Sequence, residues 1–303
     1  MTRADRRHLV NGILFASPWL IGLSVFLAYP ILSSLYYSFC DYSTLRPAVW
    51  VGLQNYQDLG QDAVMFKSLR NTLVFGAIAL PGSLTAALML ALLLNSGVRG
   101  LPIFRTIFYL PCLVPAVASA MLWLWVLNGD FGILNYALGA LLGPLGLRPP
   151  TWLADPLWAK PALAIMSIWG CGGTMVIYLA GLQDVPAELY EAAEIDGAGW
   201  WRRLFHVTLP CLSPVIYFTL IIGIIAVLQV FTPAYIMGGG PQGGTQGQPA
   251  QSTLFYALYM WAQAFEWLRM GYGCAMAWIL FVIILVLTLI AHRTAGKRVT
   301  YVG

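Results

Sequence analysis

The sequence predicts an all-α integral membrane protein with six transmembrane helices, and two observations support this prediction. Of the 303 residues, 59% are hydrophobic and 9% are charged, whereas a typical soluble domain has about 25% charged residues. Six apolar stretches of about 18–26 residues carry no formal charge, which is long enough for a helix to cross a hydrocarbon core of about 30 Å. Strand-like alternation is absent, and an open sheet cannot face lipid because its backbone groups would be unpaired. The six stretches are residues 13–36, 73–94, 107–127, 162–182, 212–237 and 272–291.

The distribution of Lys and Arg predicts the orientation. With the N-terminus inside, 10 of these residues lie in cytoplasmic segments and 6 lie outside, as the positive-inside rule requires. We therefore expect a multi-pass protein of the cell (inner) membrane with both termini in the cytoplasm. Residues 1–12 form the N-terminus, residues 13–292 the transmembrane domain and residues 293–303 the C-terminal tail. The net charge of +4 is spread over several loops, so no nucleic-acid partner is indicated.

The first outer loop, residues 39–70, precedes the second span. Gly52-Leu53 predicts a turn into a short surface helix, because Gly accepts backbone angles that other residues avoid. Lys67 and Arg70 are assigned to this loop, outside the second span.

The third span has recognisable ends. Arg105 at its start is a cationic anchor for the inner interface, and Trp123 and Trp125 at its end are typical of an outer aromatic belt. Between them, Pro111 and Pro115 predict a bent helix, because proline removes a backbone donor.

A charged insert at residues 183–210 separates the fourth and fifth spans. Glu188, Glu191 and Glu194 recur every three residues, so on a helix they share one face. The insert is unusual because charge is otherwise scarce in this chain. An exposed element of this kind is suited to binding another protein.

The predicted structure of the insert is a helix–turn–helix. Asp184 and Pro186 predict the helix start, as a capping carboxylate and a proline in the first turn. Gly197, directly after Asp196, predicts a reversal because Gly tolerates a positive φ. A second short amphipathic helix is expected to follow, and Pro210 and Pro214 mark the return into apolar sequence. The side chains of this second helix are Trp200, Trp201, Arg202, Arg203, Leu204, Phe205 and His206.

This insert resembles the EAA loop of permease subunits in binding-protein-dependent ABC importers. A Glu-Ala-Ala triplet alone is common in helices, but the full pattern between two apolar spans is specific. The residues that carry it are Glu191-Ala192-Ala193, Asp196-Gly197-Ala198, Leu209-Pro210 and Leu212-Ser213-Pro214. Other segments resemble the carbohydrate branch of this family, so that the resemblance covers residues 18–292. They are residues 51–56, 71–72, 105–111, 132–135, 151–156 and 239–241.

The resemblance implies the type I ABC importer permease fold, with a cytoplasmic EAA coupling helix–turn–helix. It implies a transport subunit and not an enzyme, one that moves a sugar or related carbohydrate across the membrane. The implied partners are a second EAA-type permease, two ABC ATPase subunits and an extracellular or periplasmic solute-binding protein. ATP and Mg would be bound by the partner ATPase, because this chain has no Walker A motif; it has no metal-ligand spacing either. The implied ATPase-coupling residues are Glu188, Glu191, Ala192, Ala193, Asp196, Gly197, Trp200 and Phe205.

Candidate substrate contacts are polar residues deep in the spans together with one aromatic platform, because sugars are bound by hydrogen bonds and ring stacking. Each candidate could equally bind a neighbouring helix. The candidates are Ser119, Ser167, Thr174, Gln229, Phe231 and Thr232. Glycines at 170, 172 and 173 allow close helix packing, or a substrate groove.

Two alternatives remain open from the sequence. An ion-coupled secondary transporter would leave the EAA pattern a coincidence, and the spans lack the ionisable group such proteins keep at mid-membrane depth. An importer of glycerol phosphate or another anionic solute would favour Arg or Lys facing the path. None lies in the spans, although a partner permease could supply one.

Overall fold

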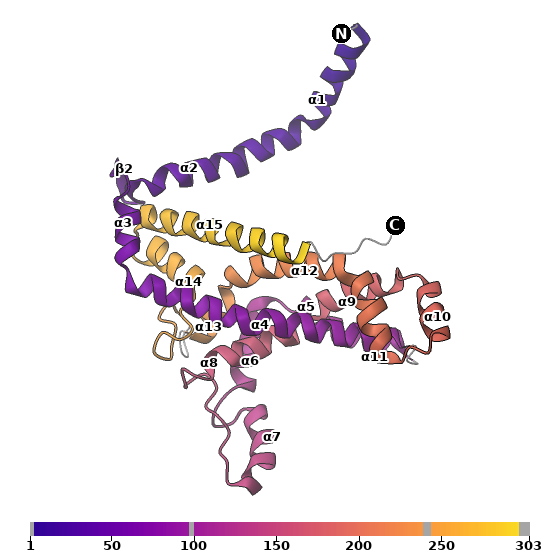
Figure 1. Cartoon of the computed structure of the whole chain (residues 1–303). Helices are drawn as coiled ribbons and strands as arrows, with labels where there is room; N and C mark the ends of the chain where they lie inside the picture. The colour runs from indigo at the N-terminus through magenta and orange to yellow at the C-terminus, as the bar shows by residue number, and fades with distance from the viewer. Residues whose placement is uncertain (1–2, 97–99, 239–243, 297–303) are drawn as a thin grey trace. The chain divides into compact units, whose positions relative to one another are not determined.

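The structure is a computed structural model that describes residues 3–96, 100–238 and 244–296 (Figure 1). Residues 239–241, which resemble the carbohydrate branch, lie outside the described residues, as do Arg99, Lys297 and Arg298, three of the basic residues assigned to the cytoplasm. Contacts divide the chain into two compact units. Unit 1 comprises Met1–Asp62 and Met260–Phe281, and unit 2 comprises Ala63–Tyr259 and Val282–Gly303.

The described residues are mostly helical, with one small hairpin in unit 1. Unit 1 begins with α1 (Arg3–Leu23), a π-helical turn (Ser24–Ala28), α2 (Tyr29–Ser38), β1 (Cys40–Ser43), β2 (Arg46–Trp50) and α3 (Gln54–Gln61). Unit 2 contains α4 (Ala63–Asn95), α5 (Leu101–Leu113), α6 (Ala116–Val126), α7 (Ile133–Leu142), α8 (Ala159–Trp169), α9 (Gly172–Gln183), α10 (Ala187–Ile195), α11 (Trp200–Arg203), α12 (Leu209–Leu228) and α13 (Thr232–Gly238). The last helices, α14 (Tyr256–Trp261) and α15 (Met270–Ala295), have residues in both units.

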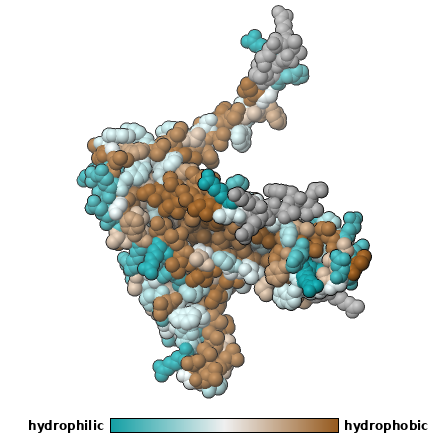
Figure 2. All heavy atoms as spheres, in the orientation of Figure 1, coloured by the Kyte–Doolittle hydropathy of each residue, from teal (hydrophilic) through white to brown (hydrophobic). Residues whose placement is uncertain are grey.

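Each of the six predicted spans falls on helix that is long and apolar enough to cross a membrane, as a single helix or as a bent pair. The single helices are Asn11–Ser38, Ala63–Asn95, Trp200–Leu228 and Met270–Thr294. The bent pairs are Leu101–Leu113 with Ala116–Val126, and Ala159–Trp169 with Gly172–Gln183. Figure 2 shows hydrophobic residues over much of the visible surface, as expected of helices that face lipid.

The third span is broken more sharply than the sequence predicts. α5 and α6 meet at 100°. Pro115 forces the residue before it away from helical backbone angles, and Val114 has a ψ of 129°. Trp125 is 78% exposed as a belt residue should be, but the aromatic-belt prediction is wrong for Trp123. That side chain is only 8% exposed and packs edge-to-face on Trp169.

Three predicted span boundaries are wrong. The second span extends N-terminally as helix to Ala63, so Lys67 and Arg70 lie on α4 and not in a loop. The fifth span does not continue to residue 237, because α12 ends at Leu228 and a separate helix, α13, follows. α13 packs against α6 in unit 2.

The fifth span also begins earlier than predicted. Helix runs without a break from Trp200 to Leu228, so the second helix of the insert and the span predicted to start at residue 212 are one helix. Proline at 210 has no N–H for the carbonyl one turn earlier. The π-helical turn Leu204–Thr208 lies directly before it and widens the helix at this point. The insert therefore joins the membrane helix directly.

The core of unit 2 forms where α4 packs against α8, α9 and α12. Small side chains on α4 let the α9 backbone approach closely. A buried hydrogen bond of 2.7 Å joins Tyr178 on α9 to Thr219 on α12. The buried cluster consists of Ala87, Ala91, Leu94, Cys171, Met175, Tyr178, Leu179, Leu182 and Leu212.

The α5 backbone lies close to Gly172 in the fourth span, which accounts for a glycine at this position. A Cβ at this position would meet the carbonyl oxygen of Phe108 and the Cα of Tyr109, which lie on α5. At Gly173 a Cβ would meet nothing within 4 Å. Of the two sequence-based explanations for these glycines, the structure supports helix packing at Gly172.

The segment after α13 is held on α4 by hydrogen bonds within unit 2. The Asn71 amide donates to the carbonyls of Gln251 (2.7 Å) and Leu254 (3.1 Å). The Lys67 ammonium donates to the Ala250 carbonyl at 3.1 Å, and the Tyr256 N–H donates to the Thr72 hydroxyl at 2.8 Å. These contacts hold residues 250–256 against α4.

In unit 1, the predicted turn and surface helix are both present. Gly52 has a φ of +64°, and α3 begins two residues later. The buried Asn55 amide donates to the carbonyls of Ser38 and Cys40, each at 2.9 Å. The β1–β2 hairpin in the same loop was not expected from the sequence.

Candidate functional site: a charged loop and two cavities

The charged insert contains a well-formed helix end at Gly197. This residue has a φ of +71°, which a residue with a side chain adopts only with strain. Its N–H donates to the Glu194 carbonyl at 3.0 Å, and the Ala198 N–H donates to the Ala193 carbonyl at 2.9 Å. These two bonds form a Schellman motif, in which the last carbonyls of a helix are satisfied beyond its end. The predicted reversal at Asp196-Gly197 is confirmed.

The predicted start of this helix is partly wrong. α10 begins at Ala187, and Pro186 is the residue before its first turn. No side chain caps α10, so Asp184 does not act as the expected capping carboxylate. Asp184 instead follows the last residue of α9.

Side-chain contacts hold α10 against the helix that follows it. The hydroxyl of Tyr190 lies 3.1 Å from that of Thr208 in the π-helical turn. A second contact, of 3.7 Å, joins Arg203 to Glu194. This ion pair is partly exposed to solvent, so it contributes little stability. The hydroxyl pair is partly buried and therefore less weakened by solvent than the ion pair.

The loop presents carboxylates and apolar side chains together. Glu188, Glu191 and Glu194 are all exposed, as are Trp200 and Phe205 on the following helix. Ala192 is exposed and Ala193 half-buried, while Asp196 and Gly197 form the exposed turn. The eight predicted coupling residues thus lie on α10, on its turn or on the first two turns of the following helix, and seven of them are exposed.

Ile195 is an apolar contributor that the sequence analysis missed. Its side chain is 87% exposed at the end of α10. Such exposure of a large aliphatic residue is typical of a surface that binds another protein. Its position one residue before Asp196-Gly197 was the available sequence signal.

The loop connects directly to a membrane helix. Trp200 begins a continuous helix of 29 residues that ends at Leu228. At 1.5 Å per residue this helix is about 43 Å long. The turn at Asp196-Gly197 joins α10 to the start of this helix.

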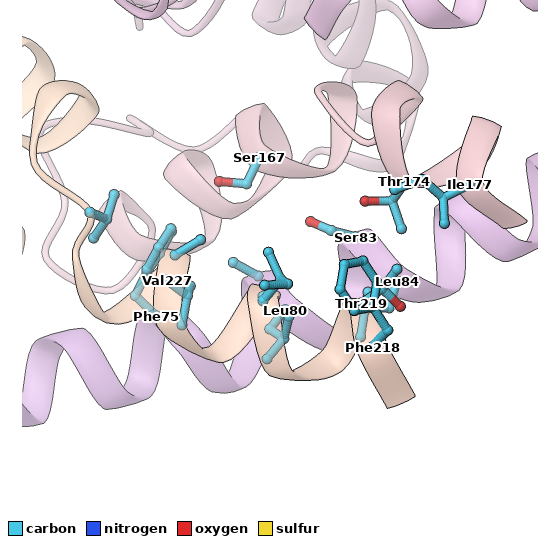
Figure 3. Close-up of a pocket in the computed structure, with 15 residues that line it drawn as sticks. Phe75, Leu80, Ser83, Leu84, Ser167, Thr174, Ile177, Phe218, Thr219 and Val227 are labelled. Atoms are coloured by element: carbon cyan, nitrogen blue, oxygen red, sulfur yellow. The ribbon is translucent and has the colours of Figure 1, made fainter. Parts of the chain in front are cut away.

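Two cavities of unit 2 contain predicted pathway residues. The smaller of these has a volume of about 330 Å³ and lies among α4, α8, α9 and α12. Figure 3 shows Ser83, Ser167 and Thr174 toward one side, facing apolar residues that include Leu80 and Phe218. The Ser167 hydroxyl donates to the Leu163 carbonyl of its own helix at 3.1 Å. That hydroxyl is therefore satisfied without a ligand.

The larger cavity has a volume of about 1170 Å³ and lies where α6 and the loops on either side of α7 meet α13. The rings of Phe231 and Tyr235 stack there with centroids 5.6 Å apart. Polar groups are supplied by Asn128, Thr151, Thr232 and Gln248, and one formal charge by Asp130. A wide cavity with stacked rings and scattered hydrogen-bonding groups has the chemistry that sugar recognition requires.

The six predicted pathway residues do not form one site. Ser167 and Thr174 line the smaller cavity, and Phe231 and Thr232 line the larger one. Ser119, which is buried, and Gln229, which is exposed at the end of α12, line neither.

Sequence reasoning missed several residues of the larger cavity. Tyr235 follows Phe231 by four residues, which places both on one helical face, but residues up to 237 had been assigned to the fifth span. Other missed lining residues are Trp125, Asn128, Asp130, Thr151 and Gln248.

Comparisons with known proteins agree with this architecture. The chain is 37% identical over 303 residues to the probable ABC transporter permease protein YesP of Bacillus subtilis (strain 168), covering 99% of this chain and 95% of that protein. It is 36% identical over 296 residues to the lactose transport system permease protein LacF of Rhizobium radiobacter, covering 97% and 96%. Among solved structures, a bacterial ABC transporter involved in the import of the acidic polysaccharide alginate matches with a TM-score of 0.81 and 25% identity, covering 98% of this chain and 99% of that one. The type I ABC importer permease fold is confirmed.

The family comparison gives the identity of the chain. Residues 68–298 match the family described as binding-protein-dependent transport system inner membrane component. The match includes the charged insert, both cavities and most of the membrane helices. This chain therefore belongs to the family of inner membrane components of binding-protein-dependent transport systems.

Proposed function

We propose that this chain is the permease subunit of an ATP-driven importer for a neutral sugar. The observation that carries the proposal is the direct connection between the exposed surface of α10 and the membrane helix that runs to Leu228. The lactose permease relative supports the sugar assignment. Membership in a binding-protein-dependent family argues against the ion-coupled alternative.

In this proposal, α10 and its turn dock on a partner ATPase. Glu188 and Glu191 contact the ATPase surface. The small side chains of Ala192 and Ala193 allow the ATPase to approach the α10 backbone closely. Ile195, Trp200 and Phe205, all exposed, supply apolar anchors. Gly197 and Asp196 hold the turn in shape.

The mechanical step follows from the helix geometry. Closure of two ATPase subunits on ATP and Mg moves the groove that holds α10. The Tyr190–Thr208 contact passes that movement to the helix beginning at Trp200. Because α12 packs against α4 and α9, its tilt rearranges the pathway. The work is done by the partner, and this chain converts it into alternating access.

The larger cavity is the proposed outer substrate site. A sugar ring would lie on the Phe231–Tyr235 stack while its hydroxyls bind Thr232, Thr151 and Asn128. The one formal charge among the described lining residues is the carboxylate of Asp130, which would repel an anionic solute. This favours a neutral sugar over glycerol phosphate or another anion. Ser167 and Thr174 would then serve helix packing in the smaller cavity.

The assembly follows from the same proposal. A second EAA-type permease closes the pathway, and a solute-binding protein delivers the sugar from outside. The loop and both termini lie in the cytoplasm, where the ATPase binds.

The test is uptake by proteoliposomes that contain the chain with its partner permease, ATPase and binding protein. Radiolabelled lactose and maltose are compared with galacturonate oligomers, with ATP inside or with a proton or sodium gradient alone. We expect ATP-dependent uptake of a neutral sugar. Uptake driven by a gradient without ATP, or uptake of the acidic oligomers alone, would contradict the proposal.

The cavity is tested by a matched pair of variants. Phe231→Ala removes a stacking surface that contributes about 0.5–1.5 kcal/mol, so the substrate concentration for half-maximal uptake should rise about 2- to 10-fold. Tyr235→Phe keeps the stacked rings and should change it much less. Equal uptake curves for Phe231→Ala and the unmodified protein would show that the sugar does not bind in this cavity.

A further inference from the structure

Helix α7 is an apolar element that belongs neither to the coupling loop nor to the transmembrane helices. Residues 131–147, which include it, contain no Asp, Glu, Lys, Arg or His. Figure 1 shows α7 set apart from the other helices of unit 2, and Figure 2 shows this region as mostly hydrophobic. Ten residues of helix extend about 15 Å, which is half of what a membrane span needs.

One side of α7 is fixed to its own loop by Asn135. The buried amide of this residue donates to the carbonyls of Gly129 (2.9 Å) and Pro150 (3.2 Å). Its carbonyl oxygen accepts a 2.7 Å hydrogen bond from the Trp152 indole. Because Gly129 and Thr151 line the larger cavity, Asn135 ties α7 to the rim of that cavity.

The opposite side of α7 is exposed and apolar. Ile133, Tyr136 and Leu141 are 74%, 85% and 70% exposed. At 100° per residue these side chains, with Ala137 and Ala140, form one stripe about 140° wide, and Asn135 lies on the other side. Water is an unfavourable neighbour for such a stripe.

The position of α7 in the chain limits where this stripe can lie. Six residues separate it from Val126, the end of a membrane helix, and the next membrane helix begins at Ala159. The aromatic residues Trp125 and Trp158 mark the ends of those two helices, as is typical of the membrane–water interface. The short N-terminal connection therefore keeps the start of α7 near the end of a membrane helix, whereas residues 143–158 connect its other end to α8.

We propose that α7 lies in the plane of the membrane, with its exposed stripe among the lipids of the outer leaflet, and anchors the rim of the larger cavity. The stripe carries one hydrogen-bonding group, the Tyr136 hydroxyl, whereas specific protein interfaces contain about one hydrogen bond per 100–200 Å². Tyrosine is enriched at headgroup depth, and Arg148 directly after the apolar stretch can reach lipid phosphates.

A second permease is the competing occupant, because Gly139 and Gly143 have the spacing of a helix-packing motif. Gly139, however, already faces the Pro149 ring of the same loop, 3.9 Å from where its Cβ would lie. Lipid remains the better match for the stripe.

The test uses the assembled importer in nanodiscs of phosphatidylethanolamine and phosphatidylglycerol. After the native cysteines are replaced, a spin label is placed singly at Ile133, Tyr136 or Leu141, and collisions with oxygen and with a water-soluble nickel chelate are measured. Leu285, exposed on α15, is the control for lipid, and Gln57, exposed on α3, is the control for water. Uptake by each labelled protein confirms that it is folded.

We expect labels on the stripe to collide with oxygen and avoid nickel, as at Leu285. Nickel collisions like those at Gln57, or protection from both reagents by a second protein, would overturn the proposal. A second measurement leaves the native cysteines in place and puts a benzophenone amino acid at Tyr136. Light should then add the mass of one phospholipid, and an adduct with the second permease or the binding protein would contradict a lipid position.

Discussion

The hydroxyl of Tyr190 lies 3.1 Å from the hydroxyl of Thr208, and this contact joins α10 to the first turns of the helix that reaches Leu228. Thr208 also donates to the Arg203 carbonyl at 3.3 Å. The contact lies in the π-helical turn that accommodates Pro210. The loop and the membrane helix are thus connected through the point where the helix is widened.

Removing this contact should weaken coupling more than assembly. Tyr190→Phe deletes a hydrogen bond that contributes about 0.5–1.5 kcal/mol, so α10 becomes less firmly attached to the helix behind it. We expect fewer sugar molecules imported per ATP hydrolysed in proteoliposomes. Tyr29→Phe, on an exposed position of α2, is the control. An unchanged ratio would show that this contact does not transmit movement.

The glycines of the fourth span should respond differently to the same change. Gly172→Ala places a methyl group against the α5 backbone at Phe108, and such overpacking costs about 1–3 kcal/mol or more. Gly173→Ala meets nothing within 4 Å and should be neutral or gain up to about 1 kcal/mol of helix propensity. Thermal unfolding in detergent measures both. Equal unfolding midpoints for the two variants would show that Gly172 is not the position in close contact with the α5 backbone.

Asn71 should be important for stability. Asn71→Ala leaves the partly buried carbonyl of Gln251 and the buried carbonyl of Leu254 without this donor, at a cost of about 1–3 kcal/mol for an unsatisfied buried group. We expect a lower midpoint of thermal unfolding and faster proteolysis after α13. Asn95→Ala, at the exposed last residue of α4, is the matched control. If both variants have the same unfolding midpoint as the native protein, other contacts hold this segment on α4.

The sequence was sufficient to predict most of the membrane architecture. Apolar length alone locates the six spans, because a helix must be about 20 residues long to cross the bilayer. The helix end at Gly197 was predicted because a positive φ has a clear residue preference. These features depend on local chemistry, which a single sequence contains.

The features that were missed depend on contacts between distant segments. Hydrophobicity is continuous through 212–237, so it gives no signal for the break after Leu228, and the stacked pair at Phe231 and Tyr235 was not foreseen. Trp123 has the composition of a belt residue but is buried against Trp169. The residues of the larger cavity come from segments more than 100 positions apart in the chain, such as Trp125 and Gln248.

The proposed function depends on α10 and its turn as the ATPase docking site. Its most direct test is the affinity of the detergent-purified permease pair for the ATPase, measured for Gly197→Ser and Gly199→Ser. Serine is strained at Gly197, where φ is +71°, by about 1–2 kcal/mol. At Gly199, where φ is −68°, it is a favourable residue before the first turn of α11.

We expect Gly197→Ser to weaken ATPase binding about 5- to 30-fold while Gly199→Ser leaves it nearly unchanged. Glu191→Lys, which reverses a charge on the docking face, should also release the ATPase, and Asp58→Lys on α3 should not. Full ATPase binding and normal uptake by both Gly197→Ser and Glu191→Lys would contradict the account of this loop.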